Sequence, residues 1–68
     1  MTRMRINGVE EEISATTLTE LLVARGVDPA ARFLAIAVNG SVVRRAEWPS
    51  RELAADDTVE IVRPLQGG

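Results

Sequence analysis

The sequence predicts an α+β fold: a four- to five-stranded mixed sheet with one main helix packed across one face. Two Asn-Gly pairs, at 7–8 and 39–40, each separate apolar segments that can pair as a hairpin. A capped segment with helical spacing lies between the two hairpins. A last alternating segment, 58–62, follows them, and we expect it to fill the middle of the sheet.

The first hairpin is predicted by alternation and by charge. Met4 and Ile6 alternate with arginines, which is the spacing of a half-buried strand. A two-residue turn at 7–8 gives three opposed pairs: Ile6 with Val9, Arg5 with Glu10, and Arg3 with Glu12. The inward face then carries Met4, Ile6, Val9 and Ile13. We interpret the acidic run 10–12 as a solvated edge strand; the alternative is a docking patch for a partner.

The helix is predicted to begin at a capping box and to end at a glycine. In the segment 17–20, Thr17 is the N-cap and Glu20 reaches back to the backbone. The stripe that faces the core consists of Leu18, Leu21 and Leu22. Gly26 can take the left-handed position after the helix, with Val27 as the apolar contact beyond it. Asp28-Pro29 then predicts a further short turn.

The second half of the chain contributes strands and one irregular stretch. Residues 33–38 form a nearly continuous apolar run, typical of a strand covered on both faces, and 41–44 form a short return strand. An irregular stretch begins at Trp48, which we interpret as a partly buried anchor at the sheet edge rather than a ligand platform, and Leu53 points inward. The pair 44–45 is a solvated strand end or, alternatively, a partner contact. The predicted core consists of Met4, Ile6, Leu18, Leu21, Leu22, Ile36, Val38, Val59 and Ile61.

The composition argues for a single small domain that is not an enzyme. The chain has 68 residues, 46% of them hydrophobic and 26% charged, as in folded domains. It contains no Cys, His, Tyr or Lys, and all eight cationic side chains are Arg. Thiol, imidazole and amine chemistry is therefore excluded, as is a Cys/His metal site, so we expect no catalytic residue and no bound metal or cofactor.

Charge and hydropathy exclude two classes of partner. A net charge of −2 leaves no basic stripe for nucleic acid. No apolar run approaches the length of a membrane span or of a signal peptide. Because cysteine is also lacking, we expect a cytoplasmic protein without nucleic-acid or membrane partners.

The C-terminus is the candidate functional site. We expect residues 1–63 to form the domain and 64–68 to form a flexible tail that ends in Gly-Gly; the alternative is a frayed end without function. Glycine lacks a Cβ, so such a tail can thread a narrow channel in another protein. Fully extended, the tail reaches about 17 Å. The carboxylate of Gly68 is then the reactive group, and Leu65, Gln66 and Gly67 enter the partner's active site.

Several segments, in order and over the whole length, resemble the ThiS family, the sulfur-carrier proteins of thiamine biosynthesis. These segments are Ile6-Asn7-Gly8, residues 18–22, residues 35–40, residues 42–48 with Arg-x-x-Trp, residues 59–62, and Gly67-Gly68. Two positions depart from the family pattern. Arg44 stands where the family usually has proline, and Asp56-Asp57 stands where it usually has Gly-Asp. Both lie away from the tail, and they put the local turn geometry in question.

The resemblance implies a β-grasp, ubiquitin-like fold and a mechanism. A ThiF-like adenylating enzyme, using ATP and magnesium, would convert the Gly68 carboxylate to an acyl-adenylate. Sulfur from a cysteine desulfurase or another persulfide donor would then give a thiocarboxylate, which thiazole synthase would consume. Arg63 is a candidate contact at the rim of the partner interface.

Three other functions stay open at the level of sequence. A MoaD-like small subunit of molybdopterin synthase shares the tail and the chemistry. A ubiquitin-like protein modifier would use the same terminal carboxylate. A plain β-grasp interaction module would make the two glycines incidental.

Overall fold

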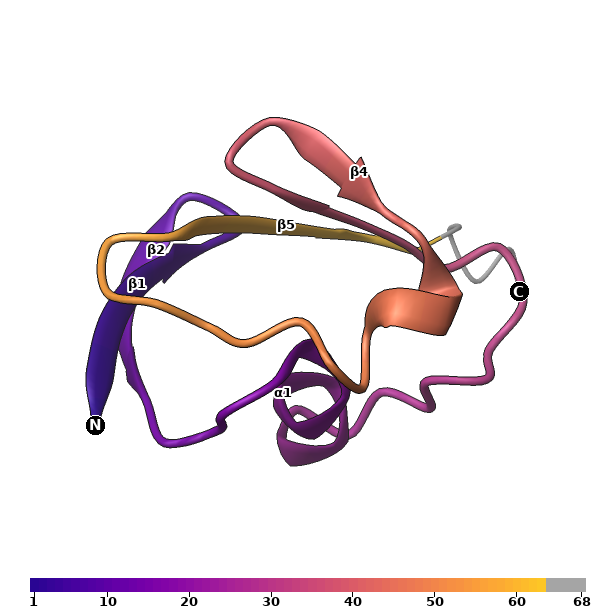
Figure 1. Ribbon diagram of the computed structural model, residues 1–68, viewed down its shortest axis with the longest axis horizontal. Helices are drawn as coiled ribbons and strands as arrows, with labels where there is room; N and C mark the ends of the chain where they lie inside the picture. Colours follow the sequence, from indigo (N-terminus) through magenta and orange to yellow (C-terminus); the bar gives the residue numbers. More distant parts are fainter. Residues whose placement is uncertain (64–68) are drawn as a thin grey trace.

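A computed structural model describes residues 1–63, which form one five-stranded sheet with a helix across one face (Figure 1). In chain order the elements are β1 Thr2–Ile6, β2 Val9–Ile13, α1 Leu18–Ala24, β3 Ala35–Val38, β4 Ser41–Val43, the 3₁₀ helix η1 Arg45–Glu47, and β5 Thr58–Val62. The spatial order of the strands is β2-β1-β5-β3-β4. The predicted α+β class is confirmed.

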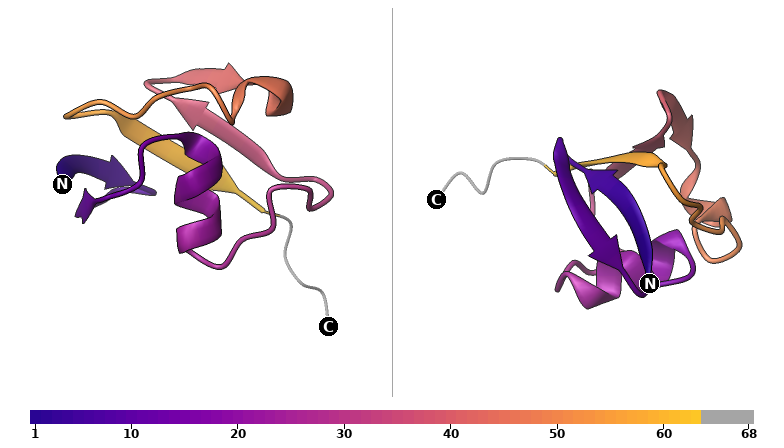
Figure 2. Two further views of the ribbon diagram at one scale, coloured as in Figure 1. Left: turned by 60° about the horizontal axis from the view of Figure 1, so that its bottom comes forward. Right: turned by 90° about the vertical axis from the view of Figure 1, so that its left-hand side faces the viewer.

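The last strand occupies the centre of the sheet, as predicted. β5 pairs in parallel with β1, through Ile6 opposite Val59, and antiparallel with β3, through Val38 opposite the same Val59. Figure 2 shows β5 between the two hairpins, with α1 lying across the sheet. The chain therefore leaves the sheet from its middle strand.

The register of the first hairpin is confirmed, but one inward position is wrong. Ile6, Arg5 and Arg3 pair with the predicted partners. Val9, expected to face inward, is 58% exposed. It lies at the turn end of an edge strand, where a neighbouring strand shields it on one side only. Glu11 shares the inward face, and its carboxylate lies 2.9 Å from the Arg25 guanidinium, just after α1.

Both predicted ends of α1 are present, with one shift in the capping box. Thr17 Oγ1 accepts a hydrogen bond from the Glu20 backbone N–H at 3.2 Å. The Glu20 carboxylate reaches one residue further back than the usual box and accepts from Thr16 N–H at 2.8 Å. Gly26 has φ 76°, and the Val27 N–H donates to Leu22 O at 2.9 Å, which closes the helix.

The core lies between α1 and the inner face of the sheet. All the predicted core residues are buried except Ile61, which is partly buried. The structure adds Ile13, Val27, Leu34 and Trp48 to this core. Leu53 packs against it from the irregular stretch, as expected.

Three interpretations of the second half of the chain are corrected. Trp48 is 1% exposed, not partly buried, because it packs in the core and its Nε1–H donates to Val43 O at 2.9 Å. The run 33–38 is not covered on both faces, since Ala35 is exposed and Phe33 is 79% exposed. Arg45 is not simply solvated: its guanidinium donates to backbone carbonyls of the 28–34 loop.

Candidate functional site

The predicted tail residues Leu65, Gln66, Gly67 and Gly68 lie outside the described residues, as does Pro64. Arg63 is described, and it follows β5 directly with an exposed side chain. The described part of the candidate site is therefore the region around the end of β5. Two features define it: the contacts that hold β5 in place, and the surface beside the point where the chain leaves the sheet.

The Asn-Gly turn of the first hairpin supports β5 near its end. Asn7, at φ 51°, donates its N–H to Val59 O at 2.9 Å. Its side-chain Oδ1 accepts from the Ile61 N–H at 2.8 Å. Because β1 ends at Ile6, this amide oxygen takes the place of a further backbone carbonyl and continues the ladder along β5.

The second Asn-Gly turn supports β5 at its start, from the other side. Asn39, at φ 53°, donates its N–H to Thr58 O at 2.8 Å and accepts from Thr58 N–H at 2.9 Å through Oδ1. The sequence signal identifies both asparagines as turn formers only. Their second role depends on β5 lying between the two hairpins, so sequence reasoning missed it.

A buried carboxylate completes the support for the start of β5. Asp57 is 6% exposed, and Oδ1 accepts from Asn39 Nδ2 at 3.0 Å while Oδ2 accepts from Ala54 N–H at 2.9 Å. The Arg51 guanidinium lies 3.9 Å from the same carboxylate. The group is thus a structural link between the second turn and the chain entering β5, not a catalytic acid.

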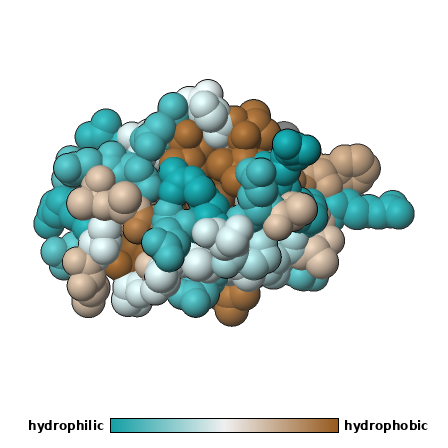
Figure 3. Space-filling model, viewed as in Figure 1, coloured by the Kyte–Doolittle hydropathy of each residue, from teal (hydrophilic) through white to brown (hydrophobic). Residues whose placement is uncertain are grey.

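The outer face of the sheet is apolar on one side of the end of β5. We use the name apolar face for the surface formed by Ala35, Ala37, Val42 and Val62. Strand register places Ala35 opposite Val62 and Ala37 opposite Val42, so these side chains share one side of the sheet. Val42 is 78% and Val62 59% exposed. Figure 3 shows hydrophobic surface gathered over the β4 and β5 region, and an exposed apolar patch of this kind is typical of an interaction surface.

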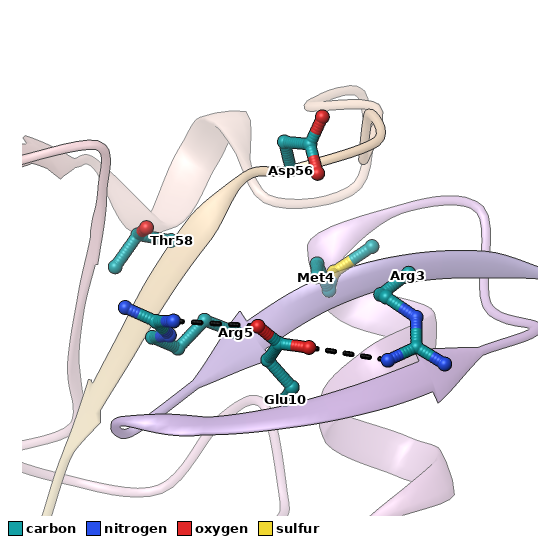
Figure 4. Close-up of a pocket in the computed structure, with 6 residues that line it drawn as sticks. All are labelled: Arg3, Met4, Arg5, Glu10, Asp56 and Thr58. Carbon is teal, nitrogen blue, oxygen red and sulfur yellow. Dashed lines mark hydrogen bonds and ion pairs between the residues drawn. The ribbon is translucent and has the colours of Figure 1, made fainter.

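The other half of the outer face is charged. Arg3, Arg5 and Glu10 border a hollow of about 190 Å³, with Thr58 and Asp56 on its far side (Figure 4). Glu10 bridges the two arginines at 3.1 and 3.4 Å. These exposed pairs neutralise one another and contribute little stability. Together with Glu60, which the register places opposite Ala37, they limit the apolar face to β3, β4 and the end of β5.

A second hollow lies beside the end of β5 on the helix side. It has a volume of about 360 Å³ and is lined by Asn7, Arg25, Val27, Ile61 and Arg63. Arg63 thus lines the hollow on the helix side, directly after Val62 of the apolar face. Among residues 1–63, no cluster of three or more acidic, His or Cys side chains has the arrangement needed for a metal ion. Within the same residues, no helix is long and apolar enough to cross a membrane.

Fold and site together define a class: a small β-grasp protein whose central strand ends beside an apolar face, with Gly67-Gly68 further along the sequence. Residues 3–68 match the ThiS family, and the chain belongs to this family. A comparison with curated proteins gave no match.

Two solved structures of a thiamine biosynthesis protein from Geobacter metallireducens are similar to this chain. The crystal structure of that protein, ThiS, has a TM-score of 0.79 and 26% sequence identity, covering 98% of this chain and 100% of the other. The solution structure has a TM-score of 0.78 at 26% identity, covering 98% and 88%. Family membership supports a role as a sulfur carrier in thiamine biosynthesis, acting with an adenylating enzyme and the thiazole-forming machinery.

At both departures from the family pattern, the backbone adopts a conformation that the family's usual residue favours. Arg44 has φ −67° and ψ 145°, the conformation that a proline ring imposes. Asp56 has φ 68°, in the left-handed region that favours glycine and that aspartate tolerates. Each position thus keeps the geometry of the residue that the family usually has there.

Proposed function

We propose that this chain carries sulfur as a thiocarboxylate on Gly68 and donates it for thiazole formation. The observation that carries the proposal is the family match, which extends through the terminal Gly67-Gly68. The structure supports it because the central strand of the sheet ends at Val62, beside the apolar face, with five residues still to follow Arg63 (68 − 63 = 5).

The chemistry takes place on the terminal carbonyl. A ThiF-like enzyme transfers AMP from ATP to the Gly68 carboxylate and releases pyrophosphate, with magnesium as its metal. The outer sulfur of a persulfide, from a cysteine desulfurase or another donor, attacks the carbonyl and AMP leaves. A thiol then attacks the donor's remaining sulfur and cleaves the resulting acyl disulfide. The thiocarboxylate stays on this chain, and the thiol and the donor's sulfur form a disulfide. Thiazole synthase takes the sulfur from the thiocarboxylate.

The carrier contributes the terminal carboxylate and a docking surface, and it holds no cofactor of its own. Its sequence supplies no thiol, imidazole or amine, so nucleophile and base belong to the partners and the chain is a co-substrate rather than an enzyme. We place the reaction in the cytoplasm, because a chain without cysteine forms no disulfide and needs no oxidising compartment.

The activating enzyme is proposed to cover the apolar face and to take residues 65–67 into its active site. Val42 and Val62 supply exposed apolar area beside the end of β5, and Arg63, the next residue after Val62, lines the hollow on the helix side. Interfaces commonly combine an apolar centre with a charged rim. The face and the tail would then engage one partner at the same time.

Mass spectrometry of the intact protein tests the proposal. The chain is incubated with its adenylating enzyme, ATP, magnesium and a persulfide source, and it should gain the mass of one oxygen-to-sulfur exchange at the last residue. Deleting Gly68 should abolish the exchange. The control is Val23→Ala, which shortens a side chain on α1 that is 62% exposed, and it should be modified like the wild type.

The same reaction separates the other candidate functions. Turnover of the thiocarboxylate by thiazole synthase supports the thiamine role, whereas turnover only by a molybdopterin synthase large subunit assigns the chain to the MoaD-like group. Attachment of Gly68 to another protein identifies a modifier. An unmodified chain in a competent system leaves only an interaction module.

A further inference from the structure

Phe33 combines two properties that are costly for an aromatic residue. Its backbone has φ 62°, in the left-handed region that bulky residues rarely occupy. Its side chain is also 79% exposed, so burial of the ring in this fold does not compensate for the strain. Backbone strain of this kind clusters at functional sites, and an observed outlier is a reason to look for a function.

Phe33 lies beside the point where the chain leaves the sheet. It precedes β3 by two residues, and the first residue of that strand, Ala35, pairs with Val62 at the end of β5. Because the two strands are antiparallel, the loop before β3 lies at the end of the sheet where β5 ends. Figures 1 and 2 agree in showing the loop before β3 next to the end of β5. Phe33 thus belongs to the loop that leads into Ala35, the residue of the apolar face that pairs with Val62.

A single arginine holds the backbone on both sides of Phe33. The Arg45 guanidinium donates to Ala31 O at 2.7 Å and to Leu34 O at 3.4 Å, and it also donates to Pro29 O. The same guanidinium lies 4.7 Å from the centre of the Trp48 ring, which is in the core. The loop is therefore tied to the folded domain by contacts that over-determine its shape, which is the condition under which a strained residue persists.

We propose that Phe33 is an aromatic anchor for the activating enzyme, inserted into an apolar recess beside the opening that receives the tail; this rests on the proposed function. Before activation, the chain ends in an ordinary carboxylate like any other protein. The enzyme that adenylates Gly68 must therefore select this chain by the folded surface around the tail. A later partner can instead recognise the thiocarboxylate. Buried aromatic side chains are frequent centres of binding energy in interfaces.

Three substitutions of Phe33 test the contribution of its aromatic ring to binding separately from the strain of its backbone. Phe33→Ala removes the ring and keeps a side chain at positive φ, Phe33→Leu keeps apolar bulk, and Phe33→Gly removes the ring and relieves the backbone. Val23→Ala is the matched control, since Val23 is an exposed apolar residue on α1 that does not line the hollow beside the end of β5. Calorimetric binding to the purified adenylating enzyme, without ATP, gives the dissociation constant of each variant.

We expect Phe33→Ala and Phe33→Gly each to raise the dissociation constant by about tenfold or more, as for a central interface residue. Phe33→Leu should change it by less than about threefold, and Val23→Ala should leave it unchanged. Phe33→Gly should also unfold at a higher temperature than Phe33→Ala, because glycine tolerates positive φ. A Phe33→Gly protein that is more stable than Phe33→Ala but binds the enzyme less tightly than the wild type would show that the chain keeps the strained backbone because it needs the ring.

The outcomes keep this inference apart from the proposed function. If the wild type is adenylated at Gly68 and Phe33→Ala binds as tightly as the wild type, the anchor is wrong while the carrier function stands. If Phe33→Ala binds normally but passes its sulfur to thiazole synthase more slowly, the ring serves the later partner and the inference is again wrong. If the wild type is not adenylated at all, both proposals fail.

Discussion

Two asparagines of this chain each perform two tasks. Asn7 and Asn39 occupy left-handed turn positions at φ 51° and 53°, and both also present an amide oxygen to a backbone N–H of β5. Glycine would adopt the left-handed turn conformation but would supply no amide oxygen. The central strand, which has hydrogen-bonded neighbours on both sides, is thereby fastened at its start and near its end.

Replacing each asparagine by glycine should release one end of β5 and not the other. Asn7→Gly keeps the turn but removes the acceptor of the Ile61 N–H, so the free energy of unfolding should fall by about 1 kcal/mol. Amide hydrogen exchange should accelerate at Ile61 and stay unchanged at Thr58. Asn39→Gly is the matched counterpart: amide hydrogen exchange should accelerate at Thr58 and stay unchanged at Ile61. Equal acceleration at both amides in either variant would contradict separate fastening.

Asp57 and its neighbour Asp56 should respond in opposite ways to substitution. Asp57→Ala removes the acceptor for Asn39 Nδ2 and Ala54 N–H in a buried place, so it should lower the free energy of unfolding by about 2–3 kcal/mol. Asp56→Gly relieves φ 68° and should be neutral or stabilise by up to about 1 kcal/mol. Urea denaturation, followed by the fluorescence of Trp48, measures both. A small effect of Asp57→Ala would show that water replaces the lost acceptor.

At the scale of elements, α1 is short and depends on its ends and on its inner stripe. Its seven residues are too few for an isolated helix, so its stability comes from packing and caps. The Thr17 cap closes one end, and Gly26 closes the other. Space is not what requires glycine there, because a Cβ on Gly26 would have no heavy atom within 4 Å. The positive φ is what requires it.

Leu22→Ala should test the inner stripe of α1. Leu22 is 0% exposed, and truncating it leaves a cavity in a core with few other residues, so the expected loss is about 2–5 kcal/mol. The measurement is the midpoint of chemical denaturation. Val23→Ala, on the exposed side of the same turn, should cost less than about 0.5 kcal/mol. A loss at Leu22 no larger than at Val23 would mean that the inner face is misassigned.

At the scale of the whole molecule, the sheet separates two functions between its faces. The inner face builds the core against α1, and the outer face is free to meet a partner. On the outer face, charged pairs occupy the β1–β2 half and apolar side chains the half that contains β3 and β4. Arg63 directly follows β5, and Phe33 precedes β3 by two residues, so both stand next to strand ends that carry the apolar half.

Arg63→Glu should slow the association with the adenylating enzyme more than it speeds dissociation. A rim charge steers the encounter of two proteins, and it contributes less once they are in contact. Stopped-flow or surface-based kinetics at low and high salt would show the change. Arg3→Glu is the control, because it makes the same change of net charge next to Asp56, at the start of β5 rather than at its end. An unchanged association rate at low salt would remove Arg63 from the interface.

The sequence by itself determined the strands, the helix with its caps, the register of the first hairpin and the central place of β5. The strands, the helix ends and the hairpin register follow from local patterns, namely alternation, capping residues and Asn-Gly turns, which act within a few residues along the chain. The central place of β5 was inferred from the order of the elements along the chain. The identity of Gly68 as the reactive residue is likewise a sequence prediction, and it lies outside the described residues.

Only the tertiary structure decided which of these residues act together. Val9 reads as an inward residue, yet it is exposed because nothing shields the outer side of its strand. Trp48 reads as an edge anchor, yet it is buried because it packs in the core and the Arg45 guanidinium lies over its ring. The second role of the asparagines and the strained, exposed Phe33 also depend on contacts between segments far apart in sequence. Local patterns do not encode such contacts, because the packing of the whole chain sets them.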